Sequence, residues 1–107
     1  MDFVQIINDN REETLFYYNN NWKKLREEAI KKEYILSYQL LDVEATEDAP
    51  FDIILITTYI DKEQYDKREE HFSELIEARG PVRLLNDKKP GDFRKILFNK
   101  DPVKHIF

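Results

Sequence analysis

The chain has 107 residues, enough for one domain with a real hydrophobic core but too short for two. Its formal net charge of -5 disfavours binding to nucleic acid, which depends on clustered Lys and Arg. The absence of cysteine excludes disulfides, thiolate nucleophiles and Cys-ligated metal centres.

No apolar run approaches the roughly 20 residues that a membrane-spanning helix needs. The first residues also lack the basic start and apolar core of a signal peptide. We therefore expect a soluble chain with no membrane partner, cytoplasmic by default. A mature secreted or periplasmic chain carrying a new start Met would look the same.

The first predicted elements are a strand and a long helix. Residues 2–7 are apolar on both faces, and Asn8, Asp9 and Asn10 after them are good helix-capping residues. In residues 11–32 apolar side chains recur at intervals of three and four, as in an amphipathic helix. This stripe consists of Leu15, Tyr18, Trp22, Leu25 and Ala29. The run Asn19-Asn20-Asn21 is the weakest turn of this helix.

Two strands follow, separated by an acidic loop over residues 44–50. Residues 34–43 alternate, as in a strand near a sheet edge. Residues 51–60, FDIILITTYI, are apolar on both faces, which is typical of a strand covered on both sides. One face carries Ile53, Leu55 and Tyr59, and the other carries Ile54, Ile56 and Ile60. Something must therefore cover a second face of the sheet.

The last predicted elements are a second helix and a short strand. Asp61 with Gln64 forms a variant capping box for a helix over residues 62–79, which Gly80 closes. Residues 93–98 predict the last strand, and residues 99–107 a tail. The order of elements predicts an α+β, ferredoxin-like βαββαβ domain over residues 1–98, with a four-stranded antiparallel sheet.

In this plan the helices cover one face of the sheet, and the first and third strands are central. Those are the two strands with apolar residues on both faces, so the uncovered face is expected to carry an apolar patch. We expect a homodimer through the sheet faces as the simplest cover. Residues 101–107, folding back, are too short to hide the whole face.

The segments WKKLREEAIKKEYILSYQLL and FDIILITTYIDKEQYDKREEHFSEL, joined by an acidic loop, resemble the dimeric α/β-barrel superfamily, particularly its uncharacterised bacterial members. Related proteins often have a Gly near the end of the first helix, where this chain has Glu33. The superfamily includes cofactor-free monooxygenases, haem-degrading enzymes, lactone isomerases and haem peroxidases, so membership does not choose a function. The resemblance implies a ligand site in a cleft between the helices and the sheet.

Two arginines are predicted to face inward. Arg26 falls near the centre of the first helix's apolar stripe, and Arg68 lies between the apolar positions of the second. A functional interpretation is an anion anchor that grips a carboxylate at the mouth of an apolar cleft. The alternative is that each guanidinium reaches solvent or pairs with a nearby carboxylate such as Glu33 or Glu69.

His71 is the only histidine inside a predicted element, which makes it the natural candidate for a general base or haem ligand. A flanking helix histidine is also commonly just half-exposed. Haem-degrading relatives are associated with an Asn, a Trp and a His. Asn8 and His71 are suitably placed, but the chain has no Trp beyond Trp22, which counts against haem degradation.

Tyr38 and Tyr59, on inner strands, are candidates for stacking on a planar ligand or donating a hydroxyl. Most of the other aromatic residues are expected to be core. The third strand lacks the basic residue and Gly of an RNA-stacking motif, and residues 8–14 lack the Gly of a phosphate nest. No His and carboxylate have metal-ligand spacing, so neither a metal nor a cofactor is expected.

The leading hypothesis is a small homodimer that binds a largely apolar or aromatic organic molecule in a helix/sheet cleft. The expected lining is Trp22, Arg26, Tyr38, Tyr59, Arg68 and His71. If a reaction occurs, cofactor-free oxygenation or isomerisation with His71 as base is the simplest proposal. The alternative is a noncatalytic dimeric sensor or assembly module, for which a filled interior without a cavity is expected.

Overall fold

The computed structural model describes residues 1–104 and has an α+β architecture. Its elements in chain order are β1 (Asp2–Ile6), α1 (Arg11–Tyr17), the π-helical segment η1 (Tyr18–Trp22), α2 (Lys23–Lys31), β2 (Ser37–Asp42), β3 (Ile53–Thr58), α3 (Lys62–Asp66), α4 (Arg68–Arg79), α5 (Pro90–Phe93) and β4 (Arg94–Asn99). The strands form one sheet in the order β2-β3-β1-β4. All neighbouring strands are antiparallel, with Phe3 opposite Ile54 on one side and Phe98 on the other.

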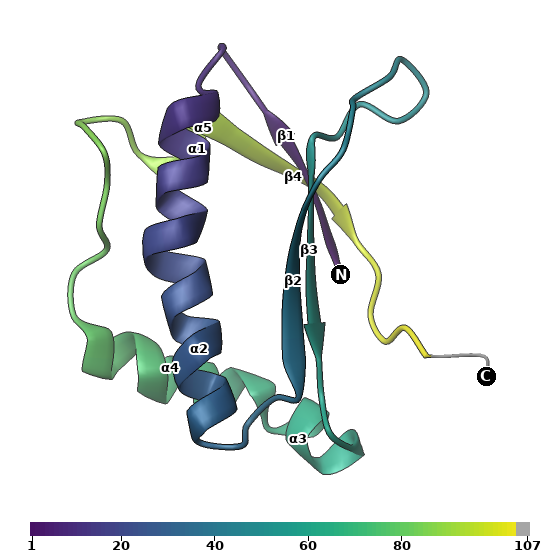
Figure 1. Ribbon diagram of the computed structural model, residues 1–107, viewed down its shortest axis with the longest axis vertical. Helices are drawn as coiled ribbons and strands as arrows, with labels where there is room; N and C mark the ends of the chain where they lie inside the picture. The colour runs from purple at the N-terminus through teal and green to yellow at the C-terminus, as the bar shows by residue number, and fades with distance from the viewer. Residues whose placement is uncertain (105–107) are drawn as a thin grey trace.

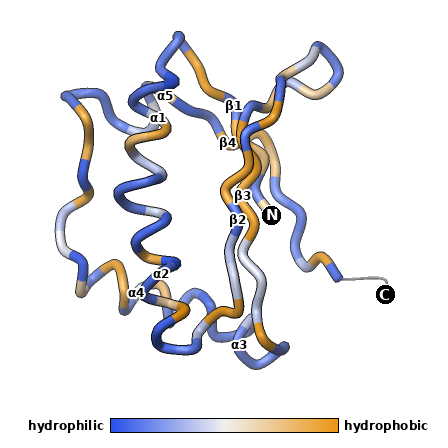
Figure 2. The backbone as a smooth tube through the Cα atoms, viewed as in Figure 1, coloured by the Kyte–Doolittle hydropathy of each residue, from blue (hydrophilic) through white to orange (hydrophobic). Residues whose placement is uncertain are grey.

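This strand order is compatible with the predicted ferredoxin-like plan, and it places β1 and β3 at the centre as expected. The long helix runs across one side of the sheet, while no helix of the described chain covers the other side (Figure 1). The hydropathy of the backbone is highest along the strands, whereas the helices alternate between apolar and polar residues (Figure 2). The core therefore lies between the sheet and the helices.

The long helix is continuous from α1 through η1 to α2, and its asparagine run does not break it. The side chain of Asn20 donates to the carbonyl of Phe16 at 2.8 Å, and that of Asn21 to the carbonyl of Tyr17 at 2.9 Å. The helix widens to π geometry over this turn, a distortion that is common at sites with a special packing requirement. The predicted weak turn is therefore a local π-bulge.

The helix begins at the predicted capping residues, but no side chain caps it. Asn10 occupies the capping position, but its side chain makes no capping hydrogen bond and instead donates to the carbonyl of Asp92 at 3.0 Å. Asn8 and Asp9 adopt left-handed backbone angles, with φ of 55° and 56°. Asn and Asp tolerate this conformation better than most residues, and here they form the turn between β1 and α1.

The second predicted helix is divided into α3 and α4, because Lys67 leaves helical geometry with φ of -92° and ψ of 4°. Its predicted ends are confirmed. The Asp61 carboxylate accepts a hydrogen bond from the backbone N–H of Gln64 at 2.9 Å. Gly80 follows α4 with φ of 84°, a conformation that favours glycine.

The strands are displaced slightly from their predicted bounds. Residues 34–36 precede β2, and β3 is shorter than the apolar run that predicted it. Phe93, the predicted start of the last strand, ends the short helix α5 instead and is 1% exposed. The predicted tail begins within β4, and its last residues, 105–107, lie outside the described residues.

The core consists of two clusters along the long helix. Val4, Tyr18, Ile53 and Leu55 form the first cluster, and Leu25, Ala29, Ile35 and Leu75 form the second. The sequence pattern did not decide which face of β3 is covered, and the structure buries the face that carries Ile53 and Leu55. The outward face of the same strand carries Ile54 and Ile56, which are only partly covered. The core therefore lies on the helix side, and the other side of the sheet keeps apolar side chains at its surface.

Candidate functional site: a cationic cleft between the helices and the sheet

A cleft of about 260 Å³ lies between the helices and β3. Four of the predicted site residues line it, namely Trp22, Arg26, Tyr59 and Arg68. The rest of its wall comes from Met1, Asp2, Leu25, Leu55, Thr57, Tyr65, Glu69, Phe72, Ile76 and Asp101. The interior between the helices and the sheet is thus not completely filled, and the cleft brings together side chains from α2, β3, α4 and the segment after β4.

Arg26 is held between two aromatic rings. Its guanidinium carbon lies 4.4 Å from the centroid of Trp22 and 4.3 Å from that of Phe72. Trp22 is four residues earlier on the same helical face, whereas Phe72 comes from α4. The cation therefore makes cation–π contacts with aromatic rings from two different helical segments.

The polar contacts of Arg26 leave part of the guanidinium edge free. Its Nε donates to Thr57 Oγ1 at 3.2 Å, and within residues 1–104 its terminal nitrogens donate no further hydrogen bond. No carboxylate of the described residues forms an ion pair with it. Burial lowers the pKa of Arg26 to about 10, which leaves the guanidinium charged at neutral pH. The cleft thus contains a fixed positive charge with unused donors.

Arg68 also lines the cleft, at the start of α4. Its guanidinium lies 3.9 Å from the ring centroid of Tyr65, and Nη1 donates to the Tyr65 carbonyl at 2.9 Å. Neither predicted carboxylate partner, Glu33 nor Glu69, forms an ion pair with it. Arg68 therefore provides a second cation in the wall of the cleft.

Tyr59 packs edge-on against Tyr65, with ring centroids 5.4 Å apart. Burial raises the pKa of the Tyr59 hydroxyl, an effect that the nearby cations Arg26 and Arg68 partly oppose. The hydroxyl is therefore protonated at neutral pH and can donate a hydrogen bond. It lies close enough to both arginines for their charges to affect its titration, so the three groups form one polar region.

The other two predicted site residues do not line the cleft. Tyr38 packs edge-on against Trp22, with ring centroids 5.7 Å apart, and so contacts a residue of the cleft wall without lining the cleft itself. His71 stacks on Tyr34, with centroids 3.7 Å apart and planes 10° from parallel. Its Nδ1 is buried and has no hydrogen-bond partner among the described residues. The structure therefore places His71 in the contact between α4 and the turn after α2.

Sequence reasoning missed the roles of Thr57 and Phe72 in holding Arg26. The periodic patterns could have identified both residues, because Thr57 shares the strand face of Tyr59 and Phe72 follows Arg68 by one helical turn.

A second cavity of about 530 Å³ lies beside the cleft. It extends to Ile56 and Thr58 on the outward face of β3 and has a mostly apolar wall.

Within residues 1–104, no group of three or more His, Asp and Glu side chains is placed to hold a metal ion. None of the helices over those residues has the length and apolarity needed to cross a membrane. In comparisons with known proteins, no family model matched the chain, and no curated protein or solved structure matched it significantly.

Proposed function

We propose that this chain is a homodimeric binding protein for a small organic anion, held at Arg26 in the helix/sheet cleft. The observation that carries the proposal is the state of the Arg26 guanidinium. It is packed between Trp22 and Phe72, has no ion-pair partner among the described residues and faces an open cleft. A buried charge is costly unless it is paired, so an external anion is a natural partner.

A carboxylate suits this position better than other ligand groups. Its two oxygens match the fork of an arginine, and within residues 1–104 the terminal nitrogens of Arg26 donate no hydrogen bond. Arg68 and the protonated Tyr59 hydroxyl are available as further donors on the same wall. The proposal concerns binding and assigns no reaction to His71.

The experiment is a titration with benzoate and with benzamide, its neutral analogue, followed by the fluorescence of Trp22, the chain's only tryptophan. Benzoate is expected to alter the fluorescence saturably and benzamide to have no effect. Arg26→Met should abolish the response, whereas Arg83→Met, which removes an exposed guanidinium on a loop, should preserve it. Equal responses to the acid and the amide, or an unchanged Arg26→Met titration, would refute the proposal.

The dimer rests on the uncovered face of the sheet. Phe3 stacks on Phe98 with centroids 4.6 Å apart, and Phe51 packs edge-on against Phe3 at 4.9 Å. Phe98 is nevertheless 45% exposed and Leu41 is 38% exposed. An antiparallel sheet can leave one face in water, but that face is then normally polar.

A second copy is the simplest cover, because the same apolar patch on two protomers is self-complementary around a two-fold axis. Such an assembly is the arrangement that the resemblance to the dimeric α/β-barrel superfamily implies. It also supports the second candidate function, a noncatalytic assembly module whose product is the dimer itself. The two candidate functions can be tested independently, because the anion titration probes one face of the sheet and association involves the other.

Association is tested by sedimentation at micromolar concentration. The wild type is expected to sediment as a dimer and Phe98→Lys as a monomer, because a charge in the centre of the apolar patch opposes burial. Val82→Lys, at an exposed valine on the loop after α4, is the matched control and should remain dimeric. A wild type that sediments as a monomer would exclude the dimer and leave anion binding to be judged separately.

A further inference from the structure

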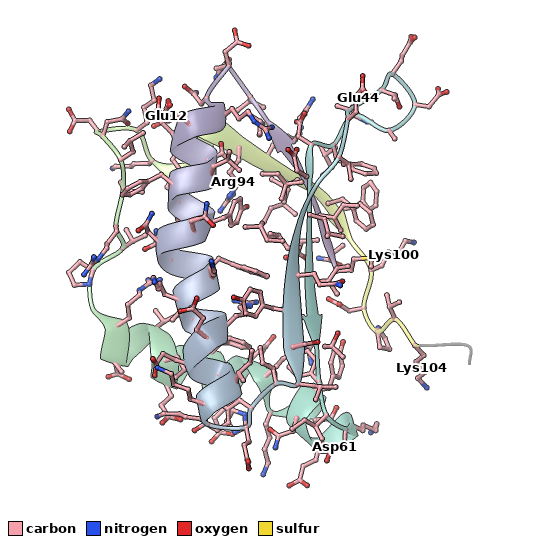
Figure 3. All side chains as sticks on the ribbon, viewed as in Figure 1. Glu12, Glu44, Asp61, Arg94, Lys100 and Lys104 are labelled. Carbon is pink, nitrogen blue, oxygen red and sulfur yellow. The ribbon has the colours of Figure 1, made fainter. Side chains whose placement is uncertain are left out.

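The cleft at Arg26 and the larger cavity beside it share part of their walls. Thr57, Tyr59 and Tyr65 line both of them. The larger cavity continues past these residues to Ile56 on the outward face of β3 and to Val103 in the segment after β4. That segment runs along the side of the sheet opposite the long helix, as the positions of Lys100 and Lys104 show (Figure 3).

The sheet is narrower at the end of β3. The ladder between β1 and β3 ends at the pair Asp2 and Leu55, whereas β2 pairs with β3 as far as Thr58. The end of β3 therefore has a ladder partner on one side only, and Tyr59 follows it directly. This is the region in which the two cavities meet, so one elongated molecule can occupy both.

The two cavities differ in chemistry. The smaller one is lined by Arg26 and Arg68. The larger one has about twice the volume and a mostly apolar wall, which includes Ile56, Pro102 and Val103. Polar groups that converge at one end of an apolar space are the usual arrangement in sites for amphipathic small molecules.

We infer that the ligand is a monocarboxylate with an extended apolar chain, a medium-chain fatty acid in chemical class. The inference rests on the proposed anion site at Arg26. The carboxylate meets the edge of Arg26 in the cleft, and the chain passes Tyr59 and lies beneath Val103 in the larger cavity. Trp22 holds Arg26 in place and is not a stacking surface for the ligand, since the guanidinium already covers its face.

The charges around the cleft favour one negative charge over two. Asp2, Glu69 and Asp101 line it together with Arg26 and Arg68. A phosphate dianion at Arg26 places its additional charge near these acids, and like charges at short range oppose binding. The larger cavity is lined by Lys62 and Lys104 as well as by Asp61 and Asp66, so charges of both signs are present there.

The test compares butanoate with octanoate by Trp22 fluorescence and calorimetry, at constant ionic strength. Each methylene buried in the larger cavity is expected to tighten binding about fourfold until the cavity is filled. Arg26→Met should abolish the binding of both monocarboxylates.

Two matched variants probe the chain-binding end. Val103→Asp should weaken octanoate binding by tenfold or more and leave butanoate binding unchanged. Val82→Asp, at an exposed valine outside both cavities, should alter neither. Both valines are surface residues, so neither substitution is expected to prevent folding.

Failure of this inference can be distinguished from failure of the anion site. Arg26-dependent binding of butanoate with no gain for octanoate would overturn the extended ligand and retain the proposed function. An unchanged octanoate affinity in Val103→Asp, with altered sedimentation, would assign the larger cavity to the second copy instead. If no carboxylate binds at all, both the anion site at Arg26 and the extended ligand are refuted.

Discussion

Asn21→Ala is expected to destabilise the protein strongly, although Asn21 lies in what sequence patterns present as the weakest turn of the long helix. Its side chain is 2% exposed and makes three hydrogen bonds. The amide nitrogen donates to the carbonyls of Tyr17 at 2.9 Å and Arg83 at 2.6 Å. The amide oxygen accepts from the backbone N–H of Arg83 at 2.8 Å. Asn21 therefore joins the helix to the loop that follows α4.

The magnitude follows from these bonds. Each intramolecular hydrogen bond contributes about 1 kcal/mol net, and a buried backbone group left without a partner costs about 1–3 kcal/mol. Alanine removes all three bonds and leaves the N–H and carbonyl of Arg83 facing a void. We expect a loss of about 3 kcal/mol in the free energy of unfolding, a large fraction of the roughly 5–15 kcal/mol typical of a domain.

Urea denaturation followed by circular dichroism measures this loss. With an m-value of roughly 1–3 kcal/mol/M, the midpoint should fall by about 1–3 M. Asn20→Ala is the matched control, because Asn20 is half-buried in the same turn and makes one bond, to the carbonyl of Phe16. It is expected to cost about 1 kcal/mol or less. Equal losses in the two variants would refute the argument that the contact with the loop, rather than the helix itself, makes this turn important.

Three further predictions concern other parts of the fold. Glu33→Gly should raise the free energy of unfolding by about 0.5–1 kcal/mol in urea denaturation. Glu33 follows the C-terminal end of α2 with φ of 60°, a conformation that costs a residue with a Cβ more than it costs glycine. A stability decrease would contradict this. Hydrogen bonds from the Tyr34 hydroxyl and then Lys32 lower the pKa of Glu74, so its contribution to stability is present above about pH 4.5 and lost as the pH falls through the lowered pKa. Urea midpoints measured across this range should therefore change less in Glu74→Gln, and parallel curves would argue against the linkage. Leu75→Ala should cost about 2–5 kcal/mol by the same assay, since Leu75 is 5% exposed in the second core cluster, and a loss below 1 kcal/mol would mean that the site collapses around the smaller side chain.

Periodicity was sufficient to predict most of the fold. The apolar pattern of β1 and β3 identifies them as the central strands, and the structure confirms this. The capping pair Asp61 and Gln64 and the closing Gly80 mark helix ends that depend on adjacent residues only. Such features are predictable because their physical causes, side-chain direction and local hydrogen bonding, operate within a few residues of the chain.

The candidate site was predictable only in part. The spacing of the long helix places Arg26 on the inward face next to Trp22, and both line the cleft. The second ring that encloses Arg26, Phe72, lies on another helix 46 residues later, and its contact depends on how α4 packs. His71 belongs to the same helix as Phe72, yet it stacks on Tyr34 outside the cleft.

The sequence by itself determined which faces of the strands and helices are apolar, and therefore the order and layering of the sheet. Only the tertiary structure decided what each of those faces meets. The π-bulge at Asn21 forms where Arg83 supplies backbone partners, and the charge on Arg26 remains available because no carboxylate of residues 1–104 pairs with it. Helical and strand periods specify the direction of a side chain relative to its own element, whereas its partners depend on packing between elements distant in the chain.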